Sequence, residues 1–516
     1  MPTAHDMLTS SFATLPDLIA AHAREQPGKV ALIHDDTALD YAALHGRMDG
    51  VAAALQRDGV PCGEAVAIIG AVSIPYALAF MGAIRAGAVP APIAPSSTPQ
   101  QVEAMIVDSG ARLVFADAEA RAALPQVAAK IVPLEHLDDW RDPPGASPQP
   151  VSIAPEDAFN IIYSSGTTGT PKGIVQPHAM RWAHIARNEG AGFGSAVTMI
   201  STPLYSNTTL VSFLPTLAWG GTVVLLGKFD AARFLQAAES HRATHAMLVP
   251  VQYARIMAVP DFDRYDLSAF RLKTCTSAPF SAALKADIVA RWPGLLVEYY
   301  GMTEGGGTCV LVCNLFPDKL ATVGRPIEGH DIRLIDDAGC EVSQGEIGEV
   351  VGRSPAMMTG YHGRRDATGE AEWFDTAGNR FIRHGDIGRF DAEGFLTLLD
   401  RKKDVIISGG FNVYPVDLEA VVLQHPMVAD AAVVGVPSAS WGETPVGFYV
   451  PVAGTDPQPS AILDWANARL GKTQRLHALH VLDELPRSAI GKVLKRALRD
   501  RYLGAEAPVT ATKDDR

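Results

Sequence analysis

The feature that most constrains the fold is a repeated pairing of a short apolar run with an amphipathic, helix-like segment. The clearest pairs are Val30–His34 with Tyr41–Gln56, Leu113–Ala116 with Glu119–Ala128, and Thr222–Leu226 with Ala231–Ser240. Strands that alternate with helices in this way predict an α/β architecture with substantially parallel sheets. The chain has 516 residues, which at about 100–200 residues per domain allows two to four domains or subdomains.

The pattern changes in the C-terminal part of the chain. From about Gly324, short strands and turns predict a hairpin-rich β region. A compact α+β segment follows Arg401, and the polar tail Gly504–Arg516 is expected to be frayed. In that segment we expect a helix over Val416–Gln424, a strand over Asp430–Val436 and a helix over Ser460–Leu470.

One uncharged stretch, Ala65–Ile84, is long enough to cross a bilayer. Gly70 and Pro75 interrupt it, so we expect a buried strand over Val66–Ile69 and a packed helix over Tyr76–Arg85. The N-terminus has no basic region followed by an apolar run, so no signal peptide is expected. A protein without a transmembrane segment is therefore predicted.

Charge and cysteine content exclude several classes of function. The 44 Lys and Arg residues against 57 Asp and Glu give a net charge of −13, and general nucleic-acid binding needs clustered basic residues instead. The five cysteines are few and scattered, which argues against a disulfide framework or a zinc finger. Buried, reduced thiols in a cytoplasmic protein are expected.

The sharpest local signal is Tyr163–Gly173, YSSGTTGTPKG, which follows the strand-like run Ala158–Tyr163. Glycines let a backbone approach an anion closely, and free N–H and hydroxyl groups can surround it. Lys172 adds a positive charge. The spacing does not fit a Walker A loop, because Pro171 precedes the lysine and Gly173 follows it. On chemistry alone, this segment is a candidate phosphate-binding loop or a flexible polar turn.

Five motifs in order then resemble the adenylate-forming superfamily of acyl-CoA synthetases, peptide-synthetase adenylation domains and luciferases. They are YSSGTTGTPKG, YYGMTEG at 299–305, GDIG at 385–388, DRKKDVIISGGFNVYPVDLE at 400–419 and PRSAIGKVLK at 486–495. The resemblance covers the chain from about residue 15 to 500, and the chain looks most like the acyl-CoA synthetases.

The resemblance implies a nucleotide site. Tyr300 would stack near adenine, Thr303 would contact the α-phosphate side and Glu304 would bind Mg²⁺, a role that suits a carboxylate beside a hydroxyl. Asp386 would hold the ribose hydroxyls, with Arg401 fixing the nucleotide from the other side. The implied cofactor-binding residues are Ser164, Ser165, Gly166, Thr167, Gly169, Thr170, Ser277, Ala278, Pro279, Tyr299, Tyr300, Gly301, Thr303, Asp386 and Arg401, and the implied catalytic residues are Thr168, Lys172, Glu304 and Lys492.

The segment Ser408–Pro415, SGGFNVYP, looks like the form found in CoA ligases. Two glycines can present bare backbone to a narrow channel, and Trp441–Glu443 (WGE) likewise resembles a CoA-ligase segment near the thiol acceptor. The resemblance therefore implies that Ser408, Gly409, Gly410 and Trp441 border the path of coenzyme A. Lys403 matches the hinge position of the family.

Two departures from the family pattern concern the acid site and the ribose site. Ser206 stands where a histidine often borders the acyl pocket, and His384 replaces a frequent threonine before Gly385. His384 could be a pH-sensitive contact or a residue with a surface or packing role.

The acid itself is constrained only by the candidate pocket. Its candidates are Tyr205, Asn207, Val251, Ser277, Met302 and Gly305–Gly307. They include no Lys or Arg for a second carboxylate and no Asp for an amino group, and the glycines would leave room. An apolar monocarboxylic acid, aromatic, arylalkanoic or of medium to long chain, is therefore expected.

The resemblance implies an α/β domain over residues 1–401, with two helix-flanked sheets and a distorted β-barrel, and an α+β lid over residues 402–503. It implies an ATP-, Mg²⁺- and CoA-dependent ligase that passes through an acyl-adenylate and releases AMP and pyrophosphate. Lys492 would bridge the carboxylate and the α-phosphate in the first step. The alternatives are an acyl-AMP ligase that loads a carrier protein, and a non-catalytic acyl or nucleotide binder. A monomer or homodimer with small-molecule partners is expected.

Overall fold

A computed structural model describes residues 1–124, 126–164, 171–408, 410–438, 440–471, 474–488 and 491–506. The chain divides into two compact units: unit 1 contains residues 1–333 and 351–384, and unit 2 contains residues 334–350 and 385–516. The expected domain boundary after Arg401 stays a prediction.

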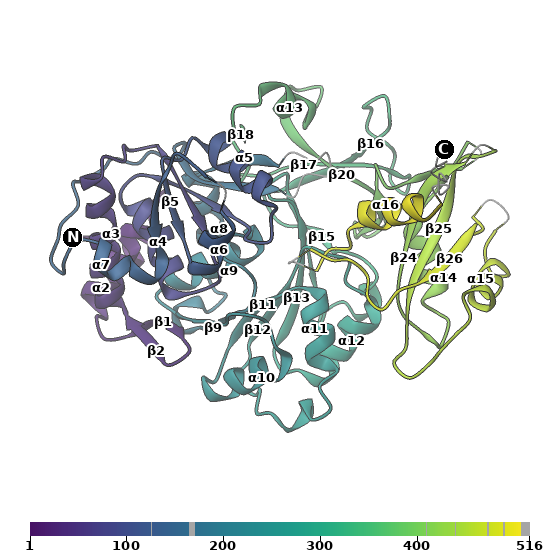
Figure 1. Ribbon diagram of the computed structural model, residues 1–516, viewed down its shortest axis with the longest axis horizontal. Coiled ribbons are helices and arrows are strands. Elements are labelled where there is room, and N and C mark those ends of the chain that lie inside the picture. Colours follow the sequence, from purple (N-terminus) through teal and green to yellow (C-terminus); the bar gives the residue numbers. More distant parts are fainter. Residues whose placement is uncertain are drawn as a thin grey trace, which may run out of the picture. The chain divides into compact units, whose positions relative to one another are not determined.

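Unit 1 is built on two sheets that are parallel at their centres, as the alternation of strands and helices predicts (Figure 1). The larger sheet has the order β15 (Arg325–Pro326), β14 (Thr308–Val312), β13 (Leu295–Gly301), β12 (Leu272–Cys275), β11 (His245–Leu248), β9 (Val197–Ile200), β10 (Thr222–Leu225), β1 (Val30–His34) and β2 (Thr37–Asp40). The smaller sheet has the order β4 (Val89–Ile93), β3 (Ala65–Ile69), β5 (Leu113–Ala116) and β6 (Lys130–Pro133), and all its pairs are parallel. A hairpin of β7 (Ala158–Ser164) and β8 (Lys172–Pro177) carries β18 (Gly360–Tyr361) on its edge.

Unit 1 contains helices that mostly bury apolar residues against these sheets or against neighbouring helices. They are α1 (Ala4–Leu8), α2 (Leu15–Glu25), α3 (Tyr41–Arg57), α4 (Ile74–Arg85), α5 (Pro99–Ser109), α6 (Ala118–Ala123), α7 (Leu137–Trp140), α8 (His178–Ala186), α9 (Asn207–Ala218), α10 (Ala231–Ser240), α11 (Pro250–Met257), α12 (Ala282–Arg291) and α13 (Arg365–Glu370). Helices α3 and α4 contribute largely to the main core. Side-chain caps fix several starts; the Asp40 carboxylate, for example, accepts the backbone N–H of Ala43 at 2.7 Å.

The stretch that is long enough to cross a bilayer folds as a strand and a helix. Strand β3 is buried along its whole length, and α4 begins after Ser73, whose hydroxyl accepts the N–H of Tyr76. In the described residues, no helix is long and apolar enough to cross a membrane. The predicted strand–helix pair is confirmed.

The β-rich region forms a five-stranded sheet, and the expected α+β region follows it. The first sheet has the order β16 (Asp331–Ile335), β17 (Gly348–Arg353), β20 (Arg380–Phe390) and β19 (Glu372–Phe374), with β21 (Leu396–Arg401) also on β20. The second has the order β23 (Phe411–Val413), β22 (Ile406–Ser408), β25 (Gly442–Pro451) and β24 (Val428–Ser438), with β26 (Ala478–Val481) on β25. The helices of unit 2 are α14 (Pro415–Val422), α15 (Pro459–Asn467) and α16 (Lys495–Glu506).

Two expectations need correction. Helix α16 continues to Glu506, so Gly504 to Glu506 are helical rather than frayed. All five cysteines are free, but Cys62 and Cys340 are exposed rather than buried.

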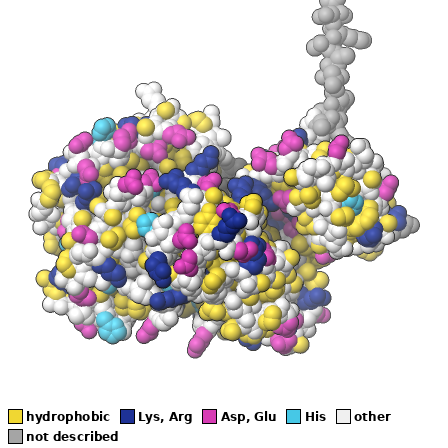
Figure 2. Space-filling view, turned by 90° about the horizontal axis from the view of Figure 1, so that it is seen from below, with side chains coloured by type: hydrophobic (Ala, Val, Ile, Leu, Met, Phe, Trp, Pro, Cys, Tyr) yellow, Lys and Arg dark blue, Asp and Glu magenta, His cyan; other side chains and the backbone are white. Residues whose placement is uncertain are grey.

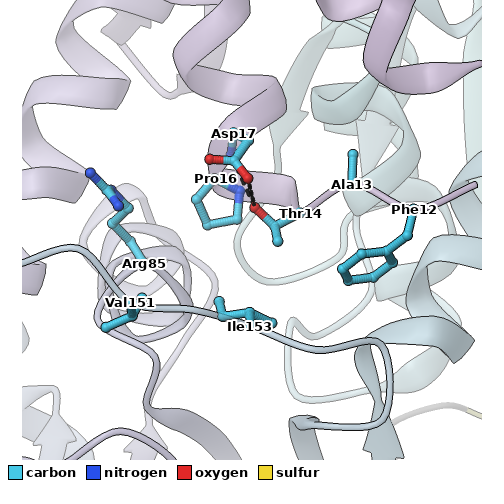
Figure 3. A pocket seen from close by; sticks show the side chains of 8 residues that line it. All are labelled: Phe12, Ala13, Thr14, Pro16, Asp17, Arg85, Val151 and Ile153. Carbon is cyan, nitrogen blue, oxygen red and sulfur yellow. Dashed lines mark hydrogen bonds between the residues drawn. The ribbon is translucent and has the colours of Figure 1, made fainter. Parts of the chain in front are cut away.

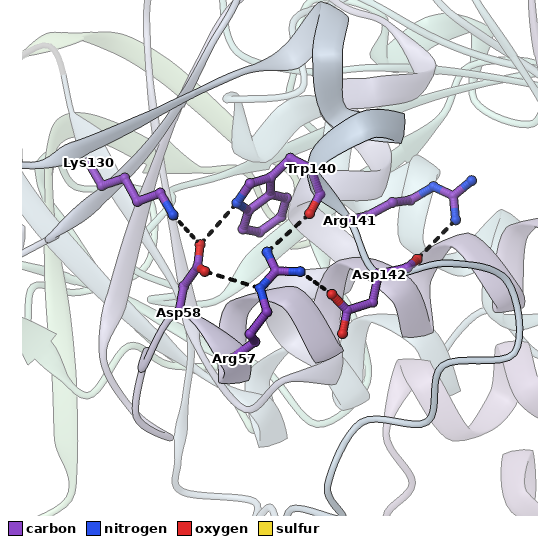
Figure 4. A network of polar contacts seen from close by, with 6 residues as sticks. All are labelled: Arg57, Asp58, Lys130, Trp140, Arg141 and Asp142. Carbon is purple, nitrogen blue, oxygen red and sulfur yellow. Dashed lines mark hydrogen bonds and ion pairs between the residues drawn. The ribbon is translucent and has the colours of Figure 1, made fainter.

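A polar network joins the end of α3 to β6 and α7 (Figure 4). The carboxylate of Asp58 accepts hydrogen bonds from Lys130 Nζ at 2.5 Å and from Trp140 Nε1 at 2.9 Å. Arg57 donates to the Trp140 carbonyl and pairs with Asp142. Such exposed pairs stabilise a fold by only about 0–1 kcal/mol each, so this network positions segments more than it strengthens them.

A small cavity of about 250 Å³ lies between the Phe12–Asp17 segment and the extended stretch with Val151 and Ile153 (Figure 3). Its polar groups already have partners, since Thr14 Oγ1 donates to Asp17 at 2.6 Å and Arg85 pairs with Asp49. None of the expected site residues lines this cavity. On the face in Figure 2, Lys and Arg side chains are mixed with Asp and Glu.

Candidate active site

The candidate phosphate-binding loop is the tip of a hairpin. Strands β7 and β8 are antiparallel, and Ser164 lies opposite Lys172 in their register. Of the expected loop residues, Ser165, Gly166, Thr167, Thr168, Gly169 and Thr170 lie outside the described residues. The antiparallel strands β7 and β8 therefore hold the two residues on either side of the candidate loop opposite each other.

Lys172, Tyr361 and Glu304 lie next to one another in unit 1. The Lys172 ammonium is 4.9 Å from the centre of the Tyr361 ring, and the Tyr361 hydroxyl donates to Glu304 Oε1 at 2.9 Å. Burial, followed by the neighbouring Glu304 carboxylate, raises the pKa of Tyr361, so its hydroxyl remains a donor. Lys172 and Tyr361 also line a cavity of about 1050 Å³. This arrangement can hold an anionic ligand beside a carboxylate that is free to bind a cation.

Strand β13 and the turn after it position the expected adenine and phosphate motif. Tyr299, Tyr300 and Gly301 end the strand, and Thr303 and Glu304 follow in a turn. His384 is only 5% exposed; its Nε2 donates to the Gly306 carbonyl at 2.6 Å, and its Nδ1 shares a hydrogen bond of 3.0 Å with Tyr300 Oη. These contacts favour the packing role for His384 over a contact with solvent or ligand.

Glycines 305–307 do not leave room for a substrate in the way the sequence suggested. A Cβ on Gly305 would lie 1.8 Å from the Ala356 carbonyl oxygen, and one on Gly307 would lie 2.6 Å from Ile332. Gly305 and Gly307 also have positive φ angles of 79° and 91°, which favour glycine. The three glycines therefore allow a close approach of protein segments. This corrects the expectation that they leave room for the acid.

Ser277, Ala278 and Pro279 follow directly after β12. Ser277 has a positive φ of 85°, one of three such non-glycine residues in the described chain. Its hydroxyl shares a 2.5 Å hydrogen bond with the hydroxyl of Thr208 in the first turn of α9. Strained backbone of this kind occurs preferentially at functional sites.

The remaining candidates for the acid pocket come from different elements. Tyr205 lies just before α9, where burial raises its pKa, and Asn207 is the first residue of that helix. Ser206 is the residue before the helix, and its side chain makes no capping bond. Val251 lies on α11, and Met302 packs against a small cluster that contains Ile174, Met358 and Ile382.

Unit 2 brings Asp386 and Arg401 together. They face each other across strands β20 and β21, and Arg401 Nε lies 2.8 Å from Asp386 Oδ1. The Asp386 side chain is 14% exposed and that of Arg401 is 41% exposed. The Asp386 carboxylate is therefore mostly buried and held by the arginine, and a carboxylate of this kind can accept hydrogen bonds from hydroxyl groups.

Lys492 lies in the electrostatic neighbourhood of this pair, although it is far away in sequence. Burial, followed by the charges of Arg401 and Lys403, lowers the pKa of Lys492 to about 8. Burial also lowers the pKa of Lys403. The backbone N–H of Ser488 donates to the Lys492 carbonyl at 2.8 Å. The structure therefore gathers Asp386, Arg401, Lys403 and Lys492.

The two segments that resemble CoA ligases also meet in unit 2. Ser408 on β22 pairs with Gly442 on β25, next to Trp441, and Glu443 accepts the backbone N–H of Ile407 at 3.0 Å. Gly410 has a positive φ of 83°, while Gly409 lies outside the described residues. Trp441 is 59% exposed, which makes its ring available to a ligand.

Sequence reasoning missed Tyr361 and the buried residues Asn160, Gln176 and Arg181. Tyr361 stands 57 residues from Glu304, and no local pattern links them. Arg181 did carry a signal. It lies three residues after His178 and four before Ile185, all on the buried side of α8, and a charge on an apolar helix face is unusual.

Comparison with known proteins identifies the family. The sequence model described as AMP-binding enzyme matches residues 19–362, and that described as AMP-binding enzyme C-terminal domain matches residues 417–492. The chain is similar to a feruloyl-CoA synthase from an Amycolatopsis species, with 34% identity over 498 residues, which cover 93% of this chain and 97% of that protein. It is also 30% identical to the fatty acid–[acyl-carrier-protein] ligase ScoC of Streptomyces coeruleorubidus, over 96% of this chain and 97% of that protein.

A solved structure supports the same conclusion. The ATP-bound MatB of Rhodopseudomonas palustris superposes with a TM-score of 0.83 at 27% identity, covering 95% of this chain and 99% of MatB. The chain belongs to the AMP-binding enzyme family.

Proposed function

We propose that this chain is an AMP-forming acid–CoA ligase. In this reaction a carboxylate attacks the α-phosphate of ATP, pyrophosphate leaves, and the thiol of CoA then displaces AMP from the acyl-adenylate. The observation that supports the proposal is the grouping of Lys172, Tyr361 and Glu304, because a cation and a carboxylate that could bind a metal ion both contact Tyr361 near the end of the candidate phosphate loop.

The residues of unit 1 would bind and polarise the phosphates. Lys172 would offset phosphate charge, and Tyr361 would orient the Glu304 carboxylate. Among the described residues, no three His, Cys, Asp or Glu side chains gather as a metal site. A single protein carboxylate fits Mg²⁺, which in nucleotide sites takes its other ligands from phosphates and water. When bound, the ion would supply electrostatic stabilisation.

The residues of unit 2 would handle the ribose and the reacting carboxylate. Asp386 would accept the ribose hydroxyls, held in place by Arg401. The Lys492 ammonium would orient the acid carboxylate and offset charge on the α-phosphate in the first step only. Lys403 remains the proposed hinge.

We propose coenzyme A as the acceptor because Ser408, Gly410 and the exposed Trp441 lie together. The second candidate is transfer of the acyl group to a carrier protein, the activity for which the relative ScoC is named. For the acid, we propose a monocarboxylic acid that is aromatic, arylalkanoic or a medium-to-long fatty acid. A cytoplasmic location and a monomeric or homodimeric state stay predictions.

The test uses purified protein with ATP, Mg²⁺ and a panel of aryl, arylalkanoic, cinnamic and fatty acids, and it measures pyrophosphate release. Product mass is then determined with CoA or with a phosphopantetheinyl carrier protein as the thiol. We expect acyl-CoA from an apolar monocarboxylic acid, with acetate and amino acids turned over much more slowly. Acyl transfer to the carrier and none to CoA would reverse the choice of acceptor, and acetate or an amino acid as the best substrate would overturn the choice of acid.

A further inference from the structure

Helix α8 places an arginine in the interior of unit 1. Arg181 is 1% exposed, and its guanidinium lies 5.7 Å from the centre of the Phe159 ring. Within the described part of the chain, no carboxylate pairs with it. Instead it donates from Nε to Asn160 Oδ1 at 3.1 Å, from Nη1 to Asn207 Oδ1 at 2.8 Å, and from Nη2 to Gln176 Oε1. A buried cation held only by neutral amides is unusual and calls for a physical reason.

The guanidinium dictates the orientation of the three amides around it. An arginine has five N–H donors and no acceptor, so each amide must turn its oxygen toward Arg181. The consequence is visible at Asn160, which is fully buried and whose Nδ2 has no hydrogen-bond partner in the described residues. Asn160 Oδ1 therefore stays hydrogen-bonded to Arg181 although this orientation leaves Asn160 Nδ2 without a partner among the described residues.

The hydrogen bond from Arg181 also fixes the orientation of the Asn207 amide, so that its Nδ2 group faces away from the guanidinium. Its Oδ1 accepts from Arg181 and also from Gln176 Nε2 at 3.4 Å, while Gln176 Nε2 donates to the Thr303 carbonyl at 2.7 Å. Because the amide is planar, the two Nδ2 hydrogens point away from the guanidinium. Asn207 is only half-buried, and no described residue accepts from its Nδ2.

The surroundings of Asn207 suit a ligand oxygen. Asn207 is the first residue of α9, a twelve-residue helix whose N-terminal N–H groups carry partial positive charge. The hydroxyl of Thr208, the next residue, is hydrogen-bonded to the hydroxyl of Ser277, whose positive φ angle indicates backbone strain. Through Gln176, Asn207 is also tied to Thr303 in the expected phosphate motif.

We propose that Arg181 is a positioning residue that sets Asn207 to donate a hydrogen bond to an acceptor oxygen of the acid. The proposal rests on the proposed acid-activating function. The oxygen belongs either to the acid's own carboxylate or to a hydroxyl, ether or keto substituent on its carbon skeleton. Selection of the acid then depends on hydrogen bonding as well as on apolar contact.

The decisive variant is Asn207→Asp. It keeps the shape of the side chain and still accepts from Arg181, but it replaces the free N–H groups with an oxygen. We expect the KM for the acid, measured by pyrophosphate release, to rise at least about tenfold, the effect of losing one hydrogen bond to a charged or polar oxygen and gaining repulsion. The KM for ATP should change by less than about twofold, and the Tm should be unchanged or higher because Arg181 gains a counter-charge.

Asn160→Asp is the matched control. It makes the same isosteric change on the same guanidinium, and it removes a buried donor without a partner. We expect a higher Tm and a KM for the acid within about twofold of wild type. An unchanged acid KM in Asn207→Asp, or an equal rise in both variants, would overturn the proposal, because the effect would then be absent or due only to charge on Arg181.

A comparison of cinnamic acid with its ring-hydroxylated and ring-methoxylated analogues identifies the oxygen. A rise in KM for all of them assigns Asn207 to the carboxylate, and a rise confined to the oxygenated acids assigns it to the substituent. If wild-type protein releases no pyrophosphate with any acid, the proposed function fails. The Tm values still test the network in that case, since a lower Tm in both Asp variants would show that Arg181 does not hold these amide oxygens.

Discussion

Single residues show how burial tunes the charges of the candidate site. Lysines usually lie exposed on protein surfaces. Burial and the neighbouring Arg401 and Lys403 nevertheless lower the pKa of Lys492 to about 8. A lysine that is partly desolvated interacts more strongly with an approaching anion, because less water must be removed from it. The cluster around Asp386 thus prepares Lys492 for a ligand that brings negative charge.

Replacing Lys492 by alanine should slow adenylation by a factor on the order of 10²–10³, the scale for loss of one charge-stabilising donor. Conversion of supplied acyl-AMP and CoA to acyl-CoA should remain largely intact, because Lys492 is proposed to act only on the attack of the acid carboxylate at the α-phosphate. Stopped-flow measurement of the adenylation rate and of the thioester-forming rate, each on its own, tests this role of Lys492. An equal loss in both, or no loss in adenylation, would show that Lys492 has been given the wrong role. Arg401→Ala, as a comparison, should impair nucleotide handling more broadly.

The pH dependence of adenylation should report the same residue. With its pKa lowered to about 8, Lys492 carries its proton below pH 8 and loses it as the pH rises through that value. Adenylation should therefore fall between about pH 7.5 and 9 in wild type. In Lys492→Arg the guanidinium stays protonated, so the same fall should be missing, although the rate is lower throughout. A pH profile of kcat/KM for adenylation, which reports groups of the free enzyme, checks this for both proteins, and identical profiles would contradict it.

Among the elements, the turn after β13 depends on glycines for packing. Gly305 has a positive φ and faces the Ala356 carbonyl at a distance that no Cβ can occupy. The turn can therefore form only if position 305 lacks a side chain. The turn that contains Glu304 therefore packs closely against the segment between β17 and β18, which contains Ala356.

Gly305→Ala should lower the free energy of unfolding by at least about 2 kcal/mol, since backbone strain of about 1–3 kcal/mol is added to a steric clash. Gly329→Ala is the control, because Gly329 also has a positive φ, of 77°, but nothing lies near its would-be Cβ. That variant should lose only about 1 kcal/mol. Urea titration of both variants separates strain from clash, and equal losses would rule out a steric role for Ala356.

At the scale of the whole molecule, the two units divide the chemical groups between them. Unit 1 contains Lys172, Glu304 and Asn207, and unit 2 contains Asp386, Lys492 and Trp441. A reaction with two half-steps can thus draw on separate sets of residues, and variants in different sets should affect different steps.

Trp441→Ala tests this division. The indole is exposed beside Ser408, so its loss should raise the KM for CoA by about tenfold, within the range for one stacked or apolar aromatic contact. The rate of pyrophosphate release without CoA should stay within about twofold. Val481→Ala, another exposed apolar residue of unit 2, is the control and should change neither quantity. A matching loss in adenylation would argue against a thiol-binding role for Trp441.

The sequence by itself determined the order and type of the elements and the family. Strands such as Val30–His34 and Leu113–Ala116 and the helix Ala231–Ser240 were predicted with the observed bounds, because periodicity and capping act over a few neighbouring residues. Helix α6 ends at Ala123, earlier than predicted, since helix ends depend on packing more than on propensity. The motifs named the family because each one is contiguous.

Only the tertiary structure decided which distant residues meet. The bond from Tyr361 to Glu304 joins positions 57 apart, and Arg181 reaches amides on β7, β8 and α9. The close approach at Gly305 depends in the same way on Ala356, which belongs to another segment. Such contacts arise where strands and helices pack, and the energy of a buried arginine or of a missing Cβ is set by neighbours that no local window of sequence contains.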